Sequence, residues 1–140
     1  MKTTSELQIG DIVYSNVYKC NCVITLIGAH SGFLTFYGKD IEMPYHINDL
    51  EHIGVTDNFL EKNFEKTELP KDGIHSALVH YRYVKDKTIV TISGGSEVRT
   101  LKIQQPFNTY IDNSLNKKIE NINDIQHLLR EFGVEKELVI

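Results

Sequence analysis

The chain has 140 residues, which is enough for one globular domain with a substantial apolar core or for a small barrel with an appendage. A hydrophobic fraction of 41% excludes an intrinsically disordered chain, and a net charge of -4 argues against nucleic acid as the main partner, because duplex-binding proteins usually carry a basic face. The longest apolar run, residues 23–28, is too short to span a bilayer, and the first residues lack the apolar stretch of a signal peptide. We therefore expect a cytoplasmic protein with no membrane partner.

The first part of the chain has the alternation of a β-meander. A turn at Ile9-Gly10 leads into a strand, and further strands are expected over 33–37 and, after a turn at 38–40, from residue 41. Between them, alternation places a set of side chains on one face of a single strand. This set consists of Tyr18, Cys20, Cys22, Ile24 and Leu26. Short strands with turns this close predict a small barrel-like antiparallel meander.

A short helix is expected after the meander. Thr56 suits its N-cap because a hydroxyl can accept a hydrogen bond from an unpaired amide of the first turn. Apolar residues at helical spacing follow, namely Phe59, Leu60 and Phe64. Residues 65–72 are polar and are expected to form a connecting loop. The predicted first part, residues 1–66, is therefore a barrel-like meander plus a short helix.

The second part, residues 67–140, repeats the β pattern and ends in a helix. Residues 74–84 and 88–93 alternate as strands, and Gly94-Gly95 permits positive φ at both central positions of a hairpin turn into a strand over 97–103. Residues 104–121 are expected to be irregular.

Residues 122–132 have the apolar spacing of a helix that packs one face on a sheet. Asn121 or Asn123 can cap this helix, and Gly133 suits the left-handed residue just past its end. The sequence thus predicts an α+β, β-rich fold. Its two parts are expected to pack as one globular unit.

The sequence contains no recognisable catalytic or metal-binding constellation. Cys20 and Cys22 lack the two-to-four-residue gap of common zinc sites, and no second cysteine pair exists. Ser114 and Lys117 match a Ser-x-x-Lys string, but the Ser-Asp-Asn and Lys-Thr-Gly elements that would support it are absent. We therefore predict a protein that is not an enzyme and that has no metal and no cofactor.

A candidate ligand site lies at the hairpin tip, where Gly94 and Gly95 offer backbone amides that can form a nest for an anion. Arg99 follows on the returning strand, and Arg82 and Tyr83 lie on an earlier one. Arginine suits a phosphate and a tyrosine face suits a base. A tip with two glycines is usually only a turn, and the sequence leaves both interpretations open.

Three segments together resemble a family. They are the start at 9–14, the segment 55–60 followed by Lys62 and Phe64, and the closing residues 122–138. They resemble small uncharacterised phage, prophage and mobile-element proteins of gut Bacteroidota. Those proteins combine an Ile-Gly-Asn/Asp-x-Val start, a central helix of Leu-Thr-Glu-Glu type and a final helix that ends in Gly. The resemblance implies a mobile-element origin, a location in the cytoplasm of a host cell and an action on host machinery.

Two functions are consistent with these observations. In the first, the chain is a non-catalytic binding module that engages a host or phage protein. In the alternative, it sequesters a nucleotide signal of host antiphage defence through Arg82, Arg99 and Tyr83 near the Gly94-Gly95 turn. The alternating strands also leave open a homo-oligomer, since an exposed sheet edge can pair with a second copy.

Overall fold

The computed structural model describes residues 6–68, 79–94, 98–105 and 113–140. The chain divides into two compact units. The first unit consists of Met1–Gly54 and Asn121–His127, and the second of Val55–Glu120 and Leu128–Ile140. Strands dominate both units, which confirms the predicted α+β, β-rich fold class.

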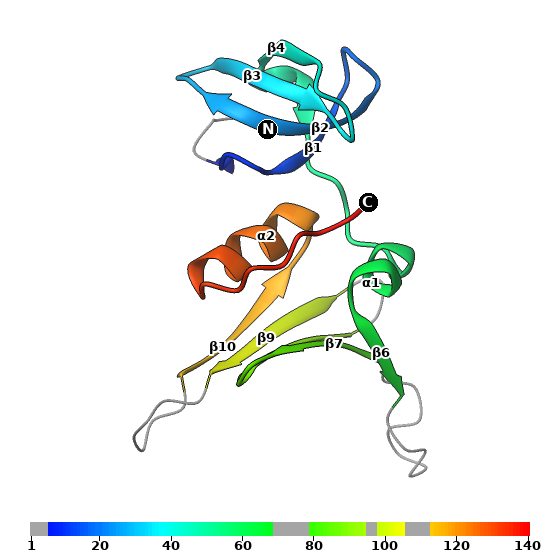
Figure 1. Cartoon of the computed structure of the whole chain (residues 1–140). Helices are drawn as coiled ribbons and strands as arrows, with labels where there is room; N and C mark the ends of the chain where they lie inside the picture. Colours follow the sequence, from blue (N-terminus) through cyan, green and yellow to red (C-terminus); the bar gives the residue numbers. More distant parts are fainter. Residues whose placement is uncertain (1–5, 69–78, 95–97, 106–112) are drawn as a thin grey trace. The chain divides into compact units, whose positions relative to one another are not determined.

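The first unit contains a five-stranded antiparallel sheet in the order β4-β3-β2-β1-β5 (Figure 1). Its elements are β1 (Ile12–Ser15), β2 (Cys20–Ile27), β3 (Ser31–Phe36), β4 (Glu42–His46), a 3₁₀ turn (Ile47–Asp49) and β5 (Leu50–Glu51). The first four strands follow each other as a meander, and β5 returns to pair with β1. The expected antiparallel meander is therefore present, and its third strand begins two residues earlier than predicted.

A β-bulge in β2 corrects one prediction about this sheet. The pairing register between β2 and β3 shifts between Ile24 and Leu26, so that Ile24 pairs with Leu34 and Leu26 with Phe33. One extra residue turns the following side chain to the opposite face. Ile24 is fully buried, whereas Leu26 is 50% exposed. The prediction that Leu26 shares a face with Ile24 is therefore wrong.

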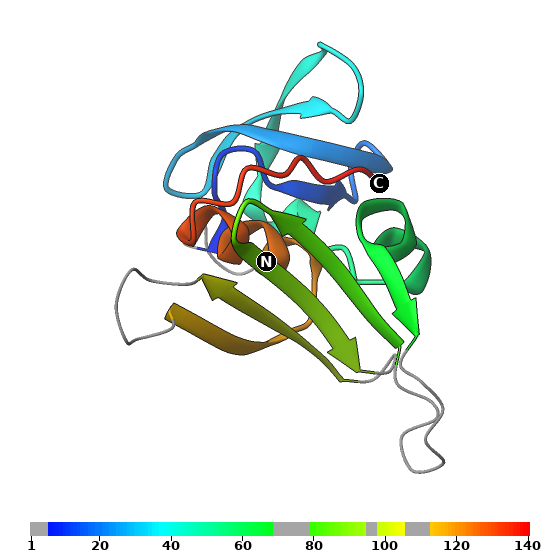
Figure 2. The ribbon, with the colours of Figure 1, turned by 60° about the horizontal axis from the view of Figure 1, so that its bottom comes forward.

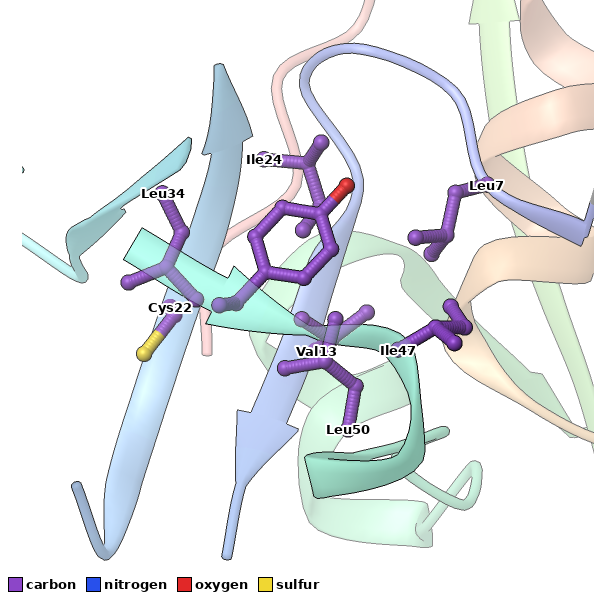
Figure 3. Packing of buried hydrophobic residues seen from close by; sticks show 8 residues of the cluster. Leu7, Val13, Cys22, Ile24, Leu34, Ile47 and Leu50 are labelled. Atoms are coloured by element: carbon purple, nitrogen blue, oxygen red, sulfur yellow. The ribbon is translucent and has the colours of Figure 1, made fainter. Parts of the chain in front are cut away.

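The core of the first unit lies on the inner face of this sheet, where side chains from every strand meet (Figure 3). The buried members are Leu7, Val13, Cys22, Ile24, Leu34, Tyr45, Ile47 and Leu50. Burial of each large aliphatic side chain contributes about 1.5–3 kcal/mol. Gly32 allows β3 to approach β2 closely, because a Cβ there would overlap the Leu26 carbonyl oxygen.

The second unit contains another five-stranded antiparallel sheet, in the order β10-β9-β8-β7-β6 (Figure 2). Its strands are β6 (Glu65–Glu68), β7 (Val79–Lys85), β8 (Thr88–Gly94), β9 (Arg99–Gln105) and β10 (Asn113–Ile119). Two predictions are corrected here, because residues 65–68 and 113–119 were expected to be loop or irregular. Both segments form the edge strands of the sheet, where one strand neighbour is enough and polar sequences are tolerated.

The predicted β8–β9 hairpin is present, but its turn is not the expected two-residue Gly94-Gly95 turn. Gly94 still belongs to β8 and pairs with Arg99. Its φ of +112°, together with a Cβ position that would overlap the Val98 carbonyl oxygen, explains why glycine is required there. Gly95 lies outside the described residues.

Two helices complete the described part of the chain, α1 (Asp57–Asn63) and α2 (Ile122–Glu131). Thr56 caps α1 as predicted, since its hydroxyl accepts from the Phe59 amide at 3.1 Å. Asn121 caps α2 by accepting from the Asp124 amide at 3.0 Å, and Asp124 accepts the Asn121 amide at 3.1 Å in return. Neither of these helices has the length and apolar character needed to cross a bilayer.

Candidate functional site

Of the five residues predicted from the sequence to bind a ligand, the four that the structure describes, Arg82, Tyr83, Gly94 and Arg99, are not brought together. In β7, Tyr83 pairs with the buried Val90, whereas the neighbouring Arg82 pairs with Thr91 and is exposed. Successive strand residues point to opposite faces. Arg82 therefore lies on the outer face of the second sheet, and Tyr83 lies on the inner face.

Arg99 and Tyr83 already have partners within the second unit. The Arg99 side chain is 6% exposed, and its guanidinium donates to Asp57 at 3.0 Å. The ammonium of Lys136 lies 4.5 Å from the centre of the Tyr83 ring. These contacts use the groups that a phosphate or a base would need. Gly94 contributes to the close β8–β9 approach rather than to an open nest.

A polar cluster in the first unit was not found by sequence reasoning. The Asp11 side chain is fully buried, accepts the Gln8 amide at 2.9 Å and lies 2.6 Å from His127 Nε2. A second histidine, His52, has Nδ1 2.7 Å from Asn123 Oδ1. Both histidine side chains are partly exposed, His127 at 27% and His52 at 28%.

Two amide side chains of α2 extend this cluster to the backbone beside β1. Gln126 accepts from the Ile12 amide at 3.0 Å and donates to the Gly10 carbonyl at 3.1 Å, and Asn123 donates to the Ile12 carbonyl at 3.0 Å. The strand β5 pairs with β1 only at Tyr14 and Ser15. The helix amides therefore satisfy backbone groups that no β5 residue reaches, which buried peptide groups require.

The polar cluster has one feature of acid–base sites, a buried carboxylate that orients a partly exposed imidazole. Such a pair becomes a catalytic arrangement only with a nucleophile or a bound substrate in reach of the second ring nitrogen. Within the described residues no group of three or more histidine, cysteine, aspartate or glutamate side chains is placed to hold a metal ion. The contacts of the cluster lead to backbone groups, so its evident role is to fix α2 to the start of β1.

A second feature of the first unit is an exposed row of apolar side chains on the outer face of its sheet. Leu26 pairs with Phe33, and Phe33 pairs with Pro44, so one side chain from each of β2, β3 and β4 lies directly beside the next. We call these three residues the apolar row. Leu26 is 50% exposed, Phe33 is 41% exposed, and Pro44 is also exposed. Single exposed apolar residues are ordinary, whereas a contiguous group is a candidate for an interaction surface.

A hollow of about 240 Å³ adjoins the apolar row through Pro44. Its wall includes Tyr18, whose hydroxyl donates to the Pro44 carbonyl, and Val17, which is 58% exposed. Asp49 places a carboxylate at the same hollow. The hollow thus combines apolar walls with one acidic group.

The two units differ in charge. The first unit has seven acidic and three basic residues, a net charge of -4, whereas the second has twelve of each. The whole net charge of the chain therefore lies in the unit that carries the apolar row. Near the row, Glu42 pairs with Thr35 on the same outer face.

Comparison with known proteins adds no relative. No protein-family model matches the chain, and neither a curated protein nor a solved structure is similar to it. The resemblance to phage and mobile-element proteins therefore stays a prediction from the sequence.

Proposed function

We propose that the chain is a non-catalytic binding module that engages a partner protein, a host or phage protein, through the apolar row of its first unit. The observation that carries this proposal is the cross-strand pairing of Leu26, Phe33 and Pro44 at an exposed sheet face. Removal of apolar area from water stabilises a complex by about 25 cal/mol per Å². A contiguous row supplies such area in one place.

The charge of the first unit indicates the chemistry of the partner surface. An apolar centre with a basic rim complements the row and the acidic residues near it, Glu42 on the sheet and Asp49 at the hollow. Opposite charge at the rim of an interface raises the association rate and selects among partners. Binding should therefore weaken as the salt concentration rises, because salt screens rim charges.

Among the described residues, no contact favours the alternative of a nucleotide-binding protein. Arg82 faces away from Tyr83, and Arg99 is held by Asp57.

The proposal can be tested by photo-crosslinking in the cells that make the protein. Benzoylphenylalanine is placed at Phe33, where the side chain is exposed, and, as a matched control, at Val84 on the second unit, which is 51% exposed. We expect a discrete crosslinked species from position 33 that is absent from position 84. The Leu26→Ser variant should reduce its yield, since it shortens the row without touching the core.

Two results would contradict this function. One is the same set of crosslinked species from positions 33 and 84. The other is a species from position 33 whose yield is unchanged by Leu26→Ser.

A further inference from the structure

The segment 134–140 follows α2 and belongs to the second unit. It has neither helical nor strand structure, yet its side chains alternate in exposure like those of a strand. Val134 and Leu138 are 9% and 5% exposed, while Glu135, Glu137 and Val139 are exposed. This is the pattern of an extended peptide that inserts alternate side chains into a receiving surface.

The backbone of this segment is recognised by one side chain. Asn63, at the end of α1, accepts the Val139 amide with Oδ1 at 2.7 Å and donates from Nδ2 to the Val139 carbonyl at 2.7 Å. The same Nδ2 donates to the Phe59 carbonyl at 2.8 Å, which fixes the orientation of the amide. Asn63 is 7% exposed. A buried side-chain amide that hydrogen-bonds to both the backbone N–H and the backbone C=O of one residue recognises the main chain, and it sets no requirement on the side chain at that position.

A third contact gives the surface side-chain selectivity. The ammonium of Lys136 lies 4.5 Å from the centre of the Tyr83 ring and 5.6 Å from that of the Phe64 ring. Aromatic faces attract a cation within about 6 Å of the ring centre. The head group of Lys136 is partly withdrawn from water here, and this burial lowers its pKa. The two rings thus form a receptacle for a lysine side chain.

A glycine and a hollow lie at the junction between α2 and this segment. Gly133 ends α2 with a φ of +69°, a glycine conformation that separates the helix from the segment. A hollow of about 210 Å³ is bounded by Gly133, Val134 and Glu135 together with Thr88, so the start of the segment borders open space. One backbone hydrogen bond, from the Val134 amide to the Leu129 carbonyl, connects this start to the helix.

We propose that the surface formed by Asn63, Phe64 and Tyr83 is a docking groove for an extended partner segment of the pattern apolar-x-Lys-x-apolar, and that residues 134–140 occupy this groove in cis. The groove lies within the second unit and does not depend on the apolar row. A partner segment of the same chemistry competes with a resident whose effective concentration is in the millimolar range for a short connection. Its apparent affinity rises when the resident is weakened.

The test uses the full chain and a fluorescent peptide with the sequence of residues 133–140. Fluorescence anisotropy is measured for the wild-type chain and for Leu138→Ser, which removes an anchor of the resident segment. We expect the variant to bind the peptide at least tenfold more tightly than the wild-type chain. Adding Asn63→Ala to the Leu138→Ser chain should abolish binding, because the main-chain contacts are lost.

A second variant keeps the proposal testable if Leu138→Ser destabilises the second unit. Lys136→Ala changes a partly exposed side chain and retains both buried anchors, and it should increase peptide affinity about threefold. A peptide that carries glutamate at the position of Lys136 should bind at least tenfold more weakly than the parent peptide. The proposal is overturned if neither variant binds more tightly than the wild-type chain, or if the two peptides bind equally well.

Discussion

Replacing Asn123 with leucine removes the centre of the polar cluster without opening a large cavity. Asn123 is 1% exposed. Its Nδ2 donates to the Ile12 carbonyl at 3.0 Å and to Gln126 Oε1 at 2.9 Å, and its Oδ1 lies 2.7 Å from His52 Nδ1. Leucine branches at the same atom as asparagine and is not smaller, so Asn123→Leu removes these polar contacts without leaving a cavity.

The size of the stability loss depends on whether each former hydrogen-bond partner of Asn123 finds another partner in the variant. The carbonyl of Ile12, a residue that is 4% exposed, is left without this donor, and a buried unsatisfied group costs about 1–3 kcal/mol. Gln126 Oε1 retains the Ile12 amide as a donor, and His52 is exposed enough for water to replace the lost contact. We therefore expect the free energy of unfolding of the first unit to fall by about 2 kcal/mol.

Urea denaturation followed by circular dichroism measures this change. With a slope of about 1–3 kcal/mol per molar urea, the unfolding midpoint should fall by about 1 M. Asn48→Leu is the matched control, since Asn48 is an exposed asparagine of the same unit, and its effect should stay within about 0.5 kcal/mol. If Asn123→Leu behaves like Asn48→Leu, the helix amides do not hold the start of β1.

Two further predictions concern single groups. Burial, reinforced by the neighbouring Cys20, raises the pKa of the Cys22 thiol to about 12, and Cys22 is fully buried. Only Cys20, which is partly exposed, should therefore react with Ellman's reagent at pH 8 in the folded chain. Both thiols should react in urea. Rapid reaction of both thiols in the folded chain would refute this prediction. Asp57→Asn weakens the partner of Arg99 and should lower the free energy of unfolding by about 1–2 kcal/mol, because the Arg99 side chain is 6% exposed although Asp57 itself is 69% exposed. Glu61→Gln, in a pair whose two side chains are both exposed, should have an effect below about 0.5 kcal/mol. Equal effects of these two variants in urea denaturation would contradict the importance of the Arg99 contact.

Local signals in the sequence predicted much of the fold. The Thr56 cap, the Gly133 helix end and the β8–β9 pairing each depend on residues whose chemistry acts over a few positions. The edge strands β6 and β10 were missed because their polar sequences lack the apolar alternation that indicates a strand. Their place is set by pairing with a neighbour, which is a tertiary effect.

The candidate surfaces were harder to predict for physical reasons. The apolar row depends on the bulge between Ile24 and Leu26, and a bulge reverses every face assignment that follows it in the strand. The polar cluster left a weak signal, namely Asn123 and Gln126 within the apolar spacing of the final helix. Its partner Asp11 is more than a hundred residues away in sequence, a distance that local patterns do not bridge.

The most direct test of the central claim is the dissociation constant of the complex between the chain and the partner protein that crosslinks to position 33. It should be measured by isothermal titration for the wild-type chain, Phe33→Ser and the matched control Val84→Ser. Because burying the exposed part of a phenylalanine contributes roughly 1–2 kcal/mol, Phe33→Ser should weaken binding about tenfold, while Val84→Ser leaves it unchanged. Equal dissociation constants for all three chains would contradict binding through the apolar row.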